Sequence, residues 1–172
     1  MTTRQAYLPT LEALLKIGVH YQLMGTGALK LYHPAALASD PLHEFDALLY
    51  PTHDNLLKLI HCLLERGWSI TSWGEPWDPT WTEAHLKGRW YVRARQGDLQ
   101  IDATYECPFL NMDDLRENVE WIDGLPVCPE EDLWYLKLLK DWGECLTYAE
   151  QYGLAVPDTA KQRAQTYKAS QL

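Results

Sequence analysis

In Glu44-Phe45-Asp46-Ala47-Leu48, two carboxylates lie one strand period apart among apolar side chains. Alternate side chains of a β-strand share a face, so Glu44 and Asp46 project together while Phe45 and Ala47 turn toward a core. Two like charges this close are stable only when they are solvated or bridged by a cation. Mg²⁺, or Mn²⁺ in its place, takes carboxylate oxygens together with water and phosphates. The segment therefore indicates either a metal site or a solvated acidic face.

A predicted β-hairpin supplies a third carboxylate. The stretches 86–95 and 99–105 alternate apolar and polar side chains on either side of a glycine turn, as paired strands do. In either of the two registers that the turn allows, Arg93, Arg95 and Asp102 share one face. Guanidinium groups beside carboxylates suit a metal-bound polyphosphate, because each can bind two phosphate oxygens. Cross-strand Arg–Asp pairs on a solvated surface would have the same pattern.

The remaining patterns predict helices interleaved with strands, which is typical of an α/β or α+β domain. We expect a mixed β-sheet flanked by helices within residues 1–125, and a C-terminal helical extension, residues 126–172, packed on the same domain. The tail after Pro157 reads as a short surface helix or a frayed end. Further helices are expected at 9–17, 28–32, 52–67, 112–118 and 129–152, and further strands at 19–24, 44–50 and 68–72. Residues 119–127 are expected to form a strand, a turn at Asp123-Gly124 and a second strand, and residues 73–84 a loop.

Composition narrows the possible classes of protein. The chain has 172 residues, 47% of them hydrophobic and 23% charged, which predicts a single folded domain rather than disorder. A net charge of −9 disfavours a general role in coating nucleic acid. Neither a signal core nor a membrane span is apparent, so we expect a cytoplasmic protein. The four cysteines form no C-x-x-C pair and are expected to be reduced and buried.

The order of these motifs resembles the DNA-polymerase-β-like nucleotidyltransferase superfamily. That family has hG[GST] at a strand-to-helix turn, [DE]h[DE]h on the next strand and a third carboxylate on a later strand. The corresponding parts here are Leu23-Met24-Gly25-Thr26, Glu44-Phe45-Asp46-Ala47 and Asp102. Asp123-Gly124-Leu125-Pro126-Val127, followed by Glu131-Asp132-Leu133 and Lys137, looks like a stretch of the small bacterial members, which include minimal, aminoglycoside-type and toxin-system enzymes.

The resemblance implies metal-dependent transfer of a nucleoside monophosphate from an NTP, such as ATP, to an acceptor. The acceptor would be a small molecule, a protein or an RNA end. Glu44, Asp46 and Asp102 would be the catalytic residues and the ligands of Mg²⁺ or Mn²⁺. The nucleotide-binding residues would be Gly25, Thr26, Arg93, Arg95 and Lys137.

Two other functions fit the same sequence. One is a catalytically inactive relative that binds a nucleotide or a protein partner, as in toxin–antitoxin or defence pairs. The other is a carbohydrate- or small-molecule-binding domain that uses the tryptophan-rich loop. In this loop Trp73, Trp77 and Trp81 recur every four residues, and with Trp68 and Trp90 they are expected to form an aromatic cluster. Those rings would serve either as a stacking platform or as anchors that hold the loop to the core.

Overall fold

A computed structural model of the protein describes residues 3–42 and 44–171. Within these residues a single sheet contains eight strands, which are β1 (Tyr21–Met24), β2 (Phe45–Leu49), β3 (Ser69–Ser72), β4 (Glu75–Pro76), β5 (Tyr91–Gln96), β6 (Leu99–Thr104), β7 (Glu120–Ile122) and β8 (Leu125–Val127). The helices are α1 (Thr3–Lys16), α2 (Gly25–Tyr32), α3 (His53–Glu65), α4 (Glu83–Leu86), α5 (Met112–Glu117), α6 (Glu130–Lys140), α7 (Trp142–Gln151) and α8 (Asp158–Ser170). Helices therefore flank a mixed sheet, which confirms the expected fold class.

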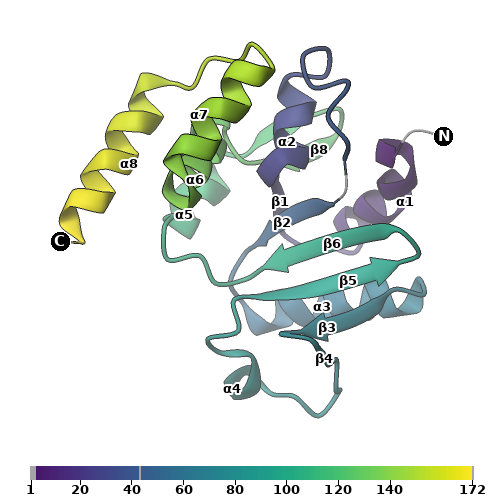
Figure 1. Cartoon of the computed structure of the whole chain (residues 1–172). Coiled ribbons are helices and arrows are strands. Elements are labelled where there is room, and N and C mark those ends of the chain that lie inside the picture. Colours follow the sequence, from purple (N-terminus) through teal and green to yellow (C-terminus); the bar gives the residue numbers. More distant parts are fainter. Residues whose placement is uncertain (1–2, 43, 172) are drawn as a thin grey trace.

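The strands follow the order β4-β3-β5-β6-β2-β1-β8-β7 across the sheet. Figure 1 shows α6, α7 and α8 grouped on one side of the molecule, away from β3, β4 and α4. The central strand β2 pairs antiparallel with β1 and parallel with β6. In the β5–β6 hairpin Gln96 lies opposite Leu99, so the turn is Gly97-Asp98 and Arg93 lies opposite Asp102. This is one of the two registers that the sequence allowed.

One face of β2 forms the centre of the core. Phe45 and Ala47 are each 1% exposed, as the strand alternation predicted. Tyr7 of α1 packs edge-on against Phe45 with the ring centroids 4.9 Å apart, and its hydroxyl accepts a hydrogen bond from the Gln100 backbone N–H. All four cysteines are free, and Cys107 alone among them is not fully buried. The core therefore fixes which side chains of β2 and β6 are left on the opposite face.

Helix boundaries differ from the prediction at three places, of which the smallest is the start of α2 at Gly25 rather than at residue 28. Helix α1 begins at Thr3 rather than at residue 9, with Pro9 inside it, because burial of Tyr7 extends the helix before the proline. The helix expected at 129–152 is divided into α6 and α7. Asp141 between them has an extended backbone, and its carboxylate accepts a hydrogen bond from the Glu144 N–H as the N-cap of α7.

The other differences lie in strand β5 and in the C-terminal tail. The strand expected from residue 86 begins only at Tyr91, because Leu86 ends α4 and Trp90 has a left-handed backbone with φ of 68°. The loop expected at 73–84 contains β4 and the start of α4. The tail forms helix α8, which packs on α6 through small buried side chains, Ala160 and Ala164. Among the described residues, no helix combines the length and apolarity that crossing a bilayer requires.

Asn55 links α3 to the strands on which the site is built. Its side chain donates hydrogen bonds to the backbone carbonyls of His20 (2.7 Å) and Tyr50 (3.1 Å) and accepts one from the His20 N–H (2.8 Å). Asn55 is 4% exposed. The two carbonyls also accept hydrogen bonds from backbone N–H groups, those of Tyr50 and Thr52, so the His20 N–H is the group whose hydrogen bond is lost when Asn55 is removed. Asn55→Ala should lower the free energy of unfolding in urea by about 2–4 kcal/mol.

The matched control for Asn55→Ala is Lys58→Ala in the same helix. Lys58 forms an exposed ion pair with Asp54, so its loss should change stability by no more than about 0.5 kcal/mol. Equal effects of the two variants would show that Asn55 does not anchor the strands.

Candidate active site

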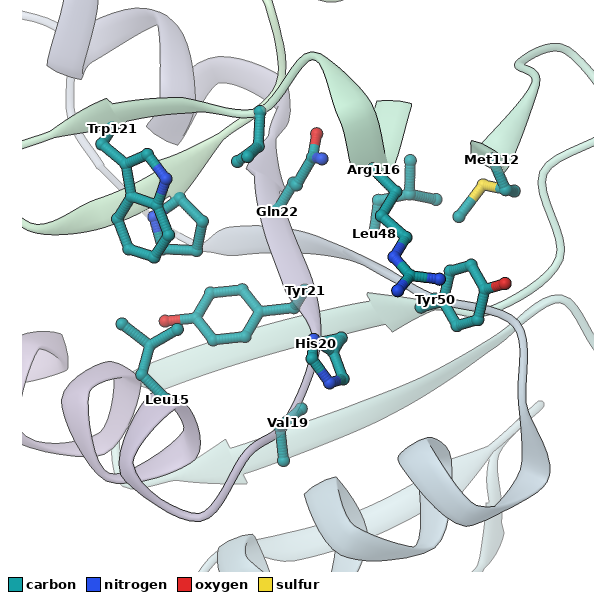
Figure 2. A pocket seen from close by; sticks show the side chains of 12 residues that line it. Leu15, Val19, His20, Tyr21, Gln22, Leu48, Tyr50, Met112, Arg116 and Trp121 are labelled. Carbon is teal, nitrogen blue, oxygen red and sulfur yellow. The ribbon is translucent and has the colours of Figure 1, made fainter. Parts of the chain in front are cut away.

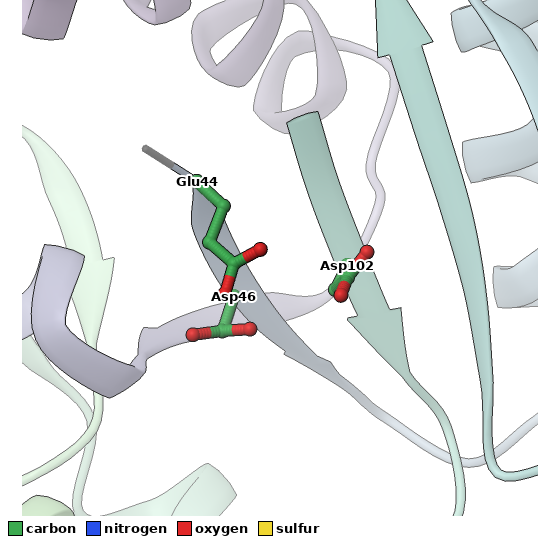
Figure 3. A group of neighbouring side chains, drawn as sticks. All are labelled: Glu44, Asp46 and Asp102. Carbon is green, nitrogen blue, oxygen red and sulfur yellow. The ribbon is translucent and has the colours of Figure 1, made fainter. Parts of the chain in front are cut away.

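Three carboxylates converge on the face of the sheet opposite the core. Glu44 directly precedes β2, Asp46 lies within β2, and Asp102 lies on β6. Parallel pairing sets Asp46 beside Asp102, and oxygen atoms of all three residues lie within 4.8 Å of one another. Figure 3 shows the Glu44 and Asp46 side chains projecting together from the start of β2, with Asp102 on the neighbouring strand. Strand alternation had correctly placed Glu44 and Asp46 on one face, whereas only the family resemblance implied that Asp102 joins them, and the roles of all three stay predictions.

The glycine turn at the start of α2 lies directly against this cluster. Gly25 has φ of 70°, and a Cβ atom there would lie 2.1 Å from Oδ2 of Asp46. At Gly27 a Cβ would lie 2.8 Å from the Phe45 ring. Only glycine allows this approach of the backbone to a carboxylate. Because the N-cap residue, Met24, makes no side-chain cap, the first N–H groups of α2 are available to an anion.

Two of the carboxylates have partners on the hairpin. Arg93 donates to both oxygens of Asp102, from Nε at 2.8 Å and from Nη2 at 2.6 Å. These hydrogen bonds raise the pKa of the Arg93 guanidinium. The side-chain amide of Gln100 donates from Nε2 to Glu44 at 2.5 Å, and its Oε1 accepts a hydrogen bond from Arg95 at 3.0 Å. Arg93 therefore lies in the cluster, whereas Arg95 reaches it through Gln100.

Among the described residues, Asp46 is the one carboxylate of the three with no hydrogen-bond partner on the hairpin. Burial, and after it the negative charges of Glu44 and Asp102, raise the pKa of Asp46 to about 7, although the charges of Lys140 and Lys137 act in the opposite direction. Near neutral pH the metal-free protein therefore carries a proton on Asp46 in part of its molecules. A cation that binds here must displace that proton.

Lys137 connects α6 to the glycine turn. Its Nζ donates a hydrogen bond to Oγ1 of Thr26 at 3.0 Å and lies 4.6 Å from the centre of the Tyr148 ring. Burial lowers the pKa of Lys137. The structure thus brings Gly25, Thr26 and Lys137 together, as the sequence motifs implied, and whether they bind a nucleotide stays a prediction.

A cavity of about 530 Å³ opens beside the carboxylates. Gly25, Thr26, Glu44, Asp46 and Lys137 contribute to its lining. Its other lining residues include Lys140, Lys168, Phe109 and Tyr167, which were not among the expected site residues, and Trp90, which belongs to the expected tryptophan cluster. Lys140 follows Lys137 by three residues on one helix, a spacing that could have identified it. The aromatic residues come from separate segments, so no local signal connected them.

The tryptophan-rich loop lies outside the lining of this cavity. Trp77 and Trp81 contact each other edge-on with centroids 5.6 Å apart, and Arg89 lies 4.7 Å over the Trp81 ring. Trp73 is 66% exposed in the turn between β3 and β4. Of the predicted tryptophan cluster, which also included Trp68 and Trp90, only Trp90 lines the cavity.

A second cavity has a volume of about 140 Å³. Figure 2 shows the side chains that line it. It lies beside β1 and is lined in part by Gln22, Leu48, Arg116 and Trp121. The Arg116 guanidinium lies 5.2 Å over the ring of Tyr50. This cavity is smaller than the usual range of about 300–1,000 Å³ for small-molecule sites, and none of the predicted site residues lines it.

No protein-family model matches the chain, and no curated protein is similar to it in sequence. Two solved structures from Helicobacter pylori are similar in part. One, a "putative nucleotidyltransferase", has a TM-score of 0.43 and 15% identity over 81% of this chain and 60% of its own. The other, JHP933, has a TM-score of 0.42 and 16% identity over 81% of this chain and 58% of its own. Since the chain spans only about three fifths of either protein and the scores are low, we infer function from the site itself.

The raised pKa of Asp46 predicts how stability depends on pH. Because the folded-state pKa of about 7 exceeds the ordinary value of 3.8, folding favours the protonated carboxyl, and the metal-free protein loses stability as pH rises from about 4 to 8. Asp46→Asn removes this loss. In urea unfolding with EDTA, the variant should be more stable than the wild type by about 2–4 kcal/mol at pH 8 and similar at pH 4.

Asp98→Asn is the control for that experiment, because Asp98 is exposed in the β5–β6 turn. This control should follow the wild type at both pH values. A loss of stability in Asp46→Asn at pH 8 would show that the ionised carboxylate has a structural role.

Proposed function

We propose that the protein is a metal-dependent nucleotidyltransferase that moves a nucleoside monophosphate from an NTP to an acceptor hydroxyl. The convergence of Glu44, Asp46 and Asp102 within 4.8 Å, next to a glycine turn, supports this function most strongly. A plain solvated acidic face does not need a backbone so close to a carboxylate that a Cβ would clash with it. The contact between Thr26 and Lys137 adds a phosphate-binding group at the same place.

The donor set fits a hard divalent cation, since it consists of carboxylate oxygens alone. Glu44 and Asp46 would hold Mg²⁺ or Mn²⁺, and Asp102 would join them when Arg93 moves aside. When bound, the metal would neutralise charge on the phosphates and so favour displacement at the α-phosphate.

The side chains and backbone around the cluster have roles of their own. The N–H groups at the start of α2 and the Thr26 hydroxyl would bind phosphate oxygens, and Lys137 and Lys140 would balance their charge. In the reaction, the acceptor oxygen forms a bond to the α-phosphorus while the bond to pyrophosphate breaks. The hydroxyl proton would pass to a carboxylate, and we assign this role to Asp102, which lies beside Asp46 on the neighbouring strand.

A second candidate is a module that binds a nucleotide or a protein partner without turnover. The specific observation in its favour is the ion pair between Arg93 and Asp102, which occupies both oxygens of the third carboxylate. A toxin–antitoxin or defence partner stays a prediction from the resemblance, and a cytoplasmic location stays a prediction from the sequence.

Calorimetry with Mn²⁺ tests the metal site, and α-labelled NTPs test the reaction. Asp46→Asn should weaken Mn²⁺ binding at least about tenfold because it removes a ligand, whereas Asp98→Asn should bind as the wild type does. In a cell extract with Mg²⁺, the wild type but not Asp46→Asn should transfer label from an NTP to an acceptor. Metal and nucleotide binding without transfer would favour the inactive module, and unchanged Mn²⁺ binding in Asp46→Asn would refute the site.

A further inference from the structure

Three aromatic side chains from distant segments line the cavity beside the carboxylates. Trp90 lies just before β5, Phe109 lies in the loop after β6, and Tyr167 lies on α8. The centroid of the Trp90 ring is 6.4 Å from that of Phe109, which is 5.7 Å from that of Tyr167 in an edge-on contact. The three rings therefore form one continuous aromatic wall of the cavity.

Trp90 is held in a conformation that disfavours a bulky residue. Its φ of 68° lies in the left-handed region, which glycine or asparagine adopts at lower cost. Its carbonyl oxygen accepts hydrogen bonds from the backbone N–H groups of Tyr105 (2.8 Å) and Glu106 (3.2 Å), which fix this conformation. The residue is nevertheless 43% exposed, so burial in the core does not explain the choice of tryptophan. Strain retained beside a candidate site points to a use of the ring in binding.

The position of the aromatic wall suits one part of a nucleotide. The Tyr105 N–H donates to the Trp90 carbonyl, so Trp90 lies beside Tyr105. Tyr105 follows Asp102 by three residues, which corresponds to about 10 Å along strand β6. This spacing leaves room for a ribose between a base at Trp90 and an α-phosphate at the carboxylates. The cavity of about 530 Å³ has the size of a site for a ligand of this kind.

We propose that Trp90, supported by Phe109 and Tyr167, is the platform on which the nucleobase of the NTP stacks. The inference rests on the proposed function and assigns the aromatic part of the cavity to the base. Aromatic stacking tolerates any base, because every base presents a π-face. A planar ring on the acceptor would have the same chemistry, and the experiment separates these two sources.

The test compares two ligands and three variants by calorimetry in Mg²⁺. The ligands are α,β-methylene-ATP, which carries a base, and inorganic tripolyphosphate, which does not. Trp90→Asn removes the ring and suits the left-handed backbone, whereas Trp90→Phe keeps a ring. Trp73→Asn is the matched control, because Trp73 also has a positive φ, of 51°, and is exposed away from the cavity.

Trp90→Asn should bind the ATP analogue about 10- to 100-fold more weakly and tripolyphosphate within about twofold of the wild type. Trp90→Phe should retain most of the affinity, and Trp73→Asn should bind both ligands unchanged. The melting temperature of Trp90→Asn should equal or exceed that of the wild type, since the substitution relieves backbone strain.

Other outcomes would overturn the assignment. Unchanged binding of the analogue by Trp90→Asn, with loss of label transfer to an acceptor, would assign the ring to the acceptor instead of the base. Equal weakening of both ligands with a lower melting temperature would make Trp90 a structural anchor. The wild type could also bind the ATP analogue no more tightly than it binds tripolyphosphate. In that case this inference fails and the proposed function stands. If the wild type binds neither ligand, both fail.

Discussion

Repulsion among three carboxylates held within 4.8 Å is the constraint on which the rest of the site depends. The hydrophobic core imposes it. Phe45 pairs with Ile101 and Ala47 with Ala103 across β2 and β6, and all four are buried. A slip of one residue would turn these side chains toward the opposite face, so burial fixes the register. The same register sets Asp46 beside Asp102, and core stability is thereby coupled to electrostatic strain on the other face.

The surrounding residues reduce this strain in different ways. Arg93 neutralises Asp102, Gln100 donates to Glu44, and the raised pKa lets Asp46 keep its proton near neutral pH. Each of these interactions is local and reversible, because a cation can displace the proton on Asp46 and the Arg93 guanidinium can exchange Asp102 for another anion. Gly25 keeps the backbone close enough for a ligand to contact the carboxylates and the start of α2 together. The carboxylates can thus bind a cation while the adjacent N–H groups of α2 bind an anion.

Short-range patterns predicted much of this arrangement. Period-2 alternation put Glu44 and Asp46 on one face, and the hairpin turn limited Arg93 and Asp102 to two registers, one of which occurs. The patterns failed where tertiary contacts decide the outcome. Capping by Asp141 divides the helix that was expected at 129–152. No local signal indicates that Trp90 would have a left-handed backbone or contact rings from two remote segments. Parallel pairing of β2 with β6 was likewise beyond any local pattern, and it is what brings Asp46 and Asp102 together.

The most direct test of the account is the position of a bound metal. A crystal grown with Mn²⁺ and a non-hydrolysable NTP should show an anomalous peak about 2.0–2.3 Å from oxygen atoms of Glu44 and Asp46. Asp102 should then have exchanged at least one of its bonds to Arg93 for the metal. An anomalous map with no peak among these carboxylates, and with the pair between Arg93 and Asp102 intact, would contradict the account.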